Sequence, residues 1–195
     1  MKLSTTTLTT AAAVAALAFA AAAATPTLAQ TKQKEQTVTV GGAPMYPSKN
    51  IVQNAVNSKD HTTLVAAVKA ASLVDTLQGP GPFTVFAPIN KAFDKLPKGT
   101  VETLLKPENK PKLVSVLTYH VVPGRLSAKD LMDAAKRNGG QAKFKTVEGD
   151  ELTVESKGNM LTIWDTKGNT SKVTIQNVFQ SNGVIHVIDT VLLPS

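Results

Sequence analysis

Hydrophobic positions in the first half of the chain recur at helical spacing. Apolar side chains three and four residues apart fill residues 51–56 and 64–71, and again residues 112–120. The alternating glycines and prolines of residues 79–82 interrupt this pattern, because neither residue type continues a helix. The spacing therefore predicts several short helices in this half.

From residue 143 onward, apolar and polar positions alternate with the period of a half-buried strand. Short turn sequences such as Gly158-Asn159 separate the alternating segments, as in tight hairpins. One more apolar, aromatic segment, residues 83–87, lies within the helical half. The pattern as a whole predicts an α+β fold. The strands expected in the second half are residues 143–147, 151–156, 160–165, 172–175, 184–189 and 191–193.

The first 29 residues have the composition of a secretory signal peptide. Lys2 precedes an almost unbroken apolar run over residues 11–24, and small residues stand before Gln30. A membrane anchor is the alternative, but a span needs about 20 strongly apolar residues. We therefore expect cleavage near Ala29, a flexible lead-in over residues 30–42 and one domain over residues 43–195. The mature protein is expected to be secreted or periplasmic, without a transmembrane anchor.

Charge and cysteine content narrow the classes of function. The 195 residues include 21 Lys and Arg against 14 Asp and Glu, a formal charge of +7, and contain no cysteine. Disulfides, thiolate metal sites and a cysteine nucleophile are therefore excluded. A basic exported protein is drawn to anionic surfaces, although scattered lysines also simply maintain solubility. Basic runs with interleaved aromatic residues are missing, which argues against specific nucleic-acid binding.

Motifs for catalysis or cofactor binding are absent from the sequence. The three histidines, His61, His120 and His186, do not have the spacing of a metal site. No nucleophile elbow of the G-x-S-x-G type occurs. The prolines among residues 79–82 remove N–H groups that a phosphate-binding loop needs. We therefore expect no enzyme activity, no metal and no cofactor.

Three segments together carry a family resemblance. Residues 83–93, FTVFAPINKAF, and residues 181–194, SNGVIHVIDTVLLP, are apolar strand patterns, and Tyr119-His120 ends a helical segment between them. In this order they resemble the two signature boxes and the Tyr-His motif of the fasciclin domain. The resemblance covers residues 43–194 and is closest to single-domain, secreted bacterial members. It implies a β-wedge of two short, mainly antiparallel sheets flanked by several short helices.

The resemblance also implies candidate partner-binding residues: Tyr119, His120 and Asp189. The Tyr-His region is associated with receptor binding in animal fasciclin domains, and its histidine is also regarded as stabilising the fold. Because His120 falls on the apolar face of its helix, we favour a structural role in which it ties the helix end to a neighbouring loop. Animal members carry an Asp-Ile adhesion motif near Asp189, whereas this chain has the reverse order, Ile188-Asp189.

Other candidate residues have structural interpretations. His186 shares a strand face with Val184 and Ile188 and is expected in the core or at a sheet edge. For Trp164, core packing and an exposed binding role are both open.

Three functions remain open at this stage. The first is an exported, non-catalytic adhesion or interaction module that binds a cell-surface or matrix protein or a polysaccharide, with self-association as a further option. The second is a periplasmic or secreted small-ligand or lipid-binding protein with a cleft between the sheet and the helices. The third is an exported hydrolase whose site has no linear motif.

Overall fold

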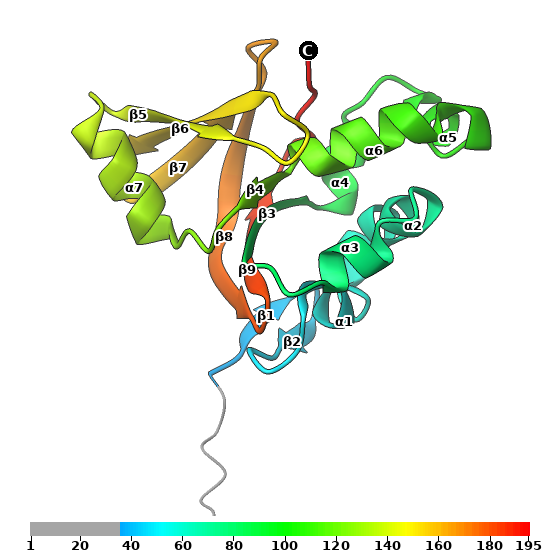
Figure 1. The fold of residues 1–195 in the computed structure, drawn as a ribbon, viewed down its shortest axis with the longest axis horizontal. Helices are drawn as coiled ribbons and strands as arrows, with labels where there is room; N and C mark the ends of the chain where they lie inside the picture. Colours follow the sequence, from blue (N-terminus) through cyan, green and yellow to red (C-terminus); the bar gives the residue numbers. More distant parts are fainter. Residues whose placement is uncertain (1–35) are drawn as a thin grey trace, which may run out of the picture. The chain divides into compact units, whose positions relative to one another are not determined.

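A parallel pair of strands, β3 and β9, forms the centre of the fold (Figure 1). In the computed structural model, which describes residues 36–195, β3 (Phe83–Pro88) lies beside β9 (Gly183–Ile188), with Phe83 opposite Gly183. Both strands are buried along almost their whole length. Strands covered on both faces carry continuous apolar runs. This burial explains why the two segments are uninterrupted hydrophobic stretches in the sequence.

The large sheet has seven strands in the order β4-β3-β9-β8-β7-β6-β5, and β3–β9 is its parallel pair. The expectation of a wedge of two short sheets is therefore wrong. β8 (Thr170–Gln180) joins the two halves, because its first three residues pair with β7 and its later residues pair with β9. The remaining strands are β4 (Val121–Pro123), β5 (Gln141–Lys145), β6 (Glu151–Lys157) and β7 (Met160–Trp164).

The α-helices within residues 36–195 all precede β5, which confirms the mixed fold with its helices toward the N-terminus. Two of them begin at reciprocal capping boxes, formed by Asn50 and Gln53 for α1 and by Ser127 and Asp130 for α7. The helices are α1 (Ile51–Ala55), α2 (Thr62–Ala70), α3 (Val74–Gln78), α4 (Asn90–Asp94), α5 (Thr100–Leu104), α6 (Lys110–Tyr119) and α7 (Ala128–Arg137), with 3-10 turns at Lys59–His61 and Pro107–Asn109.

The segment expected to be a flexible lead-in, residues 30–42, differs from that expectation where the structure describes it. Residues Val38–Val40 form β1, which pairs with β2 (Ala43–Met45) in a separate two-stranded sheet. Val40 is buried in the core, so this part of the chain belongs to the fold. The predicted signal peptide, residues 1–29, lies outside the described residues.

Two hydrophobic clusters lie on opposite sides of the central strands. On β3, Val85 belongs to the cluster beneath the N-terminal helices, whereas its neighbour Phe86 belongs to the cluster beneath α7. On β9, Ile185 and Ile188 divide in the same way. This division follows from the strand geometry, because successive side chains point to opposite faces of a sheet.

Asn182, just before β9, connects the helices to the central strands. Its buried side chain accepts a hydrogen bond from the Ile51 amide (3.1 Å) and donates to the carbonyls of Leu77 (2.8 Å) and Gly79 (2.9 Å). The next residue, Gly183, has no room for a side chain, since a Cβ there would overlap the Phe83 carbonyl oxygen. The Asn-Gly pair therefore fixes where β9 begins beside β3.

Replacing Asn182 tests this role. We expect Asn182→Ala to lower the free energy of unfolding by about 3 kcal/mol, because one buried amide and two carbonyls lose their partner. Urea unfolding followed by circular dichroism measures the change. Asn138→Ala is a matched control, since Asn138 is exposed and donates one bond to the Ala134 carbonyl (2.8 Å). Equal losses in the two variants would contradict the role of Asn182.

Candidate functional site

Tyr119, at the end of α6, is completely buried. Its hydroxyl donates to the Glu151 carbonyl (3.0 Å) at the start of β6 and accepts from the Thr166 amide (3.2 Å) after β7. Burial raises the pKa of this hydroxyl, so the side chain is a neutral phenol at physiological pH. Tyr119 thus connects α6 to the start of β6 and to the turn after β7, and presents no surface to a partner.

His120 caps the same helix and is 3% exposed. Its Nδ1 lies 2.7 Å from the Val116 carbonyl, and its Nε2 accepts the Leu192 amide at 3.0 Å. A nitrogen that accepts an N–H carries no proton, so the ring is neutral with its proton on Nδ1. Burial lowers the pKa of His120 to about 4, although the Val116 carbonyl and the Asp165 charge oppose this shift. The geometry favours the structural role expected for His120.

The C-terminal segment that follows β9 is held mainly by side chains. Residues 191–193, expected to form a strand, lie outside every described ladder. Leu192 is bound by His120, and the Leu193 amide donates to Asp165 (3.1 Å). The buried Ser171 hydroxyl donates to the Thr190 carbonyl (2.9 Å) and accepts the Thr190 amide (3.0 Å). These contacts replace the backbone pairing that a strand would have made.

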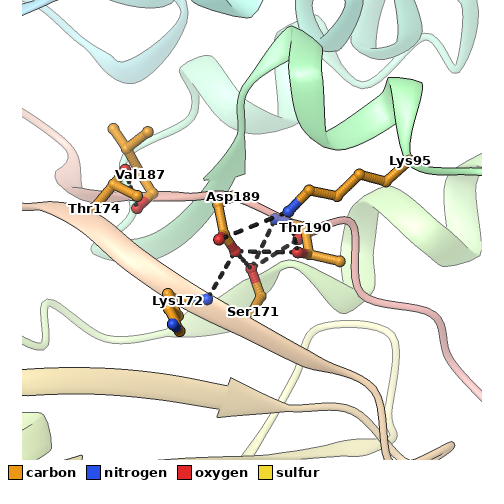
Figure 2. A network of polar contacts seen from close by, with 7 residues as sticks. All are labelled: Lys95, Ser171, Lys172, Thr174, Val187, Asp189 and Thr190. Atoms are coloured by element: carbon orange, nitrogen blue, oxygen red, sulfur yellow. Dashed lines mark hydrogen bonds and ion pairs between the residues drawn. The ribbon is translucent and has the colours of Figure 1, made fainter.

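Asp189 is the one predicted partner-binding residue that reaches the surface, with 31% of its side chain exposed. Figure 2 shows its polar contacts. The carboxylate accepts the Lys172 amide (2.9 Å) and the Thr190 hydroxyl (3.0 Å), and lies 3.7 Å from the Lys95 ammonium. Partial burial opposes ionisation, but these donors and the Lys95 charge outweigh it and lower the pKa of Asp189. Asp189 is therefore an ionised, largely satisfied carboxylate.

The residues around this carboxylate form a surface that we call the Asp189 patch. Lys95, Lys172 and Thr174 are exposed, and Asp189 and Thr190 are half-buried. Lys95 also donates to the Thr190 hydroxyl (3.0 Å). Lys95 brings its ammonium to the carboxylate, whereas Lys172 binds it through the backbone amide. With two lysines and one carboxylate, the patch carries a positive charge and suits an anionic partner.

The structure brings the predicted residues together only indirectly. Tyr119 and His120 are neighbours in the core, whereas Asp189 lies at the surface, and His120 reaches the segment that follows Asp189 through Leu192. Two supporting residues were not predicted: Asp165 and Ser171. Asp165 opens the turn Asp-Thr-Lys-Gly-Asn, a sequence in which an aspartate commonly binds nearby amides. Ser171 has no comparable local signal.

The other candidate residues, His186 and Trp164, have hydrogen-bond partners within the fold. His186 is buried on β9, where Nε2 meets the Leu126 carbonyl (2.9 Å). Trp164 is half-buried on β7, and its indole donates to Glu155 (3.0 Å). Within residues 36–195, no three His, Cys, Asp or Glu side chains come close enough to hold a metal ion. The helices of this part are too short or too polar to cross a bilayer.

Comparison with known proteins agrees with this geometry. The family model of the fasciclin domain matches residues 59–194, and the chain belongs to the fasciclin domain family. It is 44% identical over 167 residues to Protein sll1483 of Synechocystis, covering 86% of each chain. It is also 37% identical over 131 residues to transforming growth factor-beta-induced protein ig-h3 of Sus scrofa, covering 67% of this chain and 17% of that protein.

A solved structure has the same fold. It is a FAS1 domain pair from the insect cell adhesion molecule Fasciclin I, which superposes with a TM-score of 0.66 at 19% identity. The match covers 82% of this chain and 58% of the insect chain, so the protein spans little more than half of that domain pair. The fold expected from the family resemblance is thereby confirmed, apart from the division into two sheets.

The buried histidines predict that acid destabilises the protein. The unfolded chain binds a proton at His120 with a pKa near 6.5, whereas the folded protein binds it near 4. Stability is therefore lost as the pH falls from 6.5 to 4, by about 3 kcal/mol for His120. Burial lowers the pKa of His61 and His186 as well, which adds to the loss. Urea unfolding at several pH values between 6.5 and 4 measures the loss of stability.

His120→Ala is the test of the assignment to His120. The variant should be less stable at pH 7, because the Val116 carbonyl and the Leu192 amide lose their partner. It should also lose less stability than the parent protein between pH 6.5 and 4. An unchanged pH dependence would show that His120 does not control it.

Proposed function

We propose that this protein is an exported adhesion or extracellular interaction module without catalytic activity. Membership of the fasciclin domain family carries the proposal, together with the fold shared with a domain pair from an insect cell adhesion molecule. The apolar segment before Gln30 supports export by a cleaved signal peptide. The partner is expected to be a protein or polysaccharide at a cell surface or in a matrix.

The Asp189 patch is our candidate contact surface. A partner can reach Lys95, which is 52% exposed, and Lys172 without any change in the fold. The rings of Tyr119 and His120 are buried and would need the core to open. We therefore assign these two residues a supporting role, in which His120 fixes Leu192 and so the segment that carries Asp189.

The charge of the patch favours an acidic partner. Charged side chains at the rim of an interface mainly steer association and set its salt dependence. Binding through Lys95 and Lys172 should therefore weaken as the ionic strength rises. A single domain of this kind does not crosslink two surfaces alone, so adhesion requires self-association or display in many copies.

Charge reversal tests the surface without disturbing the fold. We expect Lys172→Glu to weaken binding to cells of the producing organism roughly tenfold, because attraction to an acidic partner becomes repulsion. Titration of cells with the fluorescently labelled protein measures the affinity. Lys106→Glu is the matched control, with the same charge change at an exposed position between α5 and α6.

The possible outcomes distinguish an error in the contact surface from an error in the proposed function. Equal binding by the two variants would rule out the Asp189 patch while leaving adhesion through another surface. Absence of saturable binding by the unaltered protein to cells and to extracted envelope polysaccharide would contradict the proposed function itself. Circular dichroism of each variant confirms that the fold is retained.

A further inference from the structure

An apolar cavity of about 60 Å³ lies between the central sheet and helices α1, α2 and α3. Val85 and Ile185 of the central strands form its floor, and Val68 and Leu77 of the helices form part of its wall. Empty space of this kind lowers stability, because the surrounding side chains lose contacts. A ligand that restores those contacts is therefore stabilised by the same packing.

His61, at the wall of this cavity, has an unsatisfied polar atom. The residue is 3% exposed, and its Nδ1 is bound by the Ser58 hydroxyl at 2.9 Å. Its Nε2 is buried and makes no well-aligned hydrogen bond among residues 36–195, although the Ala87 backbone lies close enough to oppose the lowering of the His61 pKa by burial. Buried polar atoms are almost always paired, so the packing at this side of the cavity is imperfect.

The cavity reaches the surface beside one cationic side chain. Lys69, near the end of α2, is exposed and contributes to the lining, as do the half-buried Ala55, Val65 and Val74. Lysine commonly covers apolar surface with its methylene chain while its ammonium remains in water. The site therefore has an apolar interior and a positive charge at its opening.

We infer that this cavity binds a single-chain alkyl carboxylate, with the chain inside and the carboxylate beside Lys69. The walls provide apolar contacts for methylene groups, and the lysine complements the charge of the head group. A water-sized group needs roughly 10–15 Å³ of such a cavity, so about four to six groups fit. This capacity holds about four to six of the seven carbons that follow the carboxyl group of octanoate, and the remaining carbons would lie in the opening beside Lys69. The site is separate from the Asp189 patch and goes beyond the adhesion role.

Octanoate is the appropriate probe for the full chain. Isothermal titration calorimetry should show saturable 1:1 binding, and thermal unfolding should show a higher melting temperature with octanoate. Octylamine, which has the same chain and the opposite charge, should bind more weakly. Lys69→Gln should weaken octanoate binding about fivefold, since the charge is lost at an exposed position.

Two alanine variants test the location. Ala55→Leu places additional carbon at the cavity and should weaken octanoate binding at least tenfold. Ala66→Leu makes the same change at an exposed position of α2 outside the lining and should leave it unchanged. The inference is overturned if octanoate does not saturate, if octylamine binds equally well, or if neither Ala55→Leu nor Lys69→Gln weakens binding. Lys69→Gln changes only an exposed side chain, so it still tests the inferred binding site if Ala55→Leu does not fold.

Discussion

The parallel pairing of β3 with β9 is the constraint on which the rest of the structure depends. The two strands are 94 residues apart in the chain, yet they pair along their whole length, from Phe83–Gly183 to Pro88–Ile188. Gly183 allows the close approach of β9 to β3. Asn182 binds α1 and α3 beside the start of β9. Because both faces of the pair are buried, each of the two hydrophobic clusters uses it as one wall.

The Tyr-His motif extends this constraint to the end of the chain. The His120 carbonyl accepts the Phe86 amide (2.9 Å), so the backbone of the motif is bound to β3, while the His120 ring holds Leu192. Tyr119 connects the same helix end to β6 and to the turn after β7. The family signatures are therefore neighbours in space. They identify the fold because they build its central strands and the supports of its C-terminal segment.

Features that depend on near neighbours in the chain were predictable from the sequence. The strand at residues 83–87, the helix that ends at His120 and the inward position of that histidine follow from periodicity alone. The single sheet was not predictable, because two successive parts of β8 pair with different strands and no local pattern encodes that change. The position of residues 191–193 depends on Asp165, Ser171 and His120, which are remote in the chain. Their apolar sequence resembles a strand, but the amides of Leu192 and Leu193 are bound by side chains.

Asp189 itself can contribute little to recognition. Its carboxylate already accepts bonds from Lys172 and Thr190 and lies beside the Lys95 ammonium, so few acceptor positions remain for a partner. Removing it would disturb the segment that follows β9 and would confuse folding with binding. Lys172 is exposed, and the Lys95 side chain is 52% exposed even though its ammonium contacts Thr190 and Asp189. Recognition at this surface therefore depends on the two lysines. Asp189 helps to position them through its ion pair with Lys95 and the hydrogen bond from the Lys172 amide.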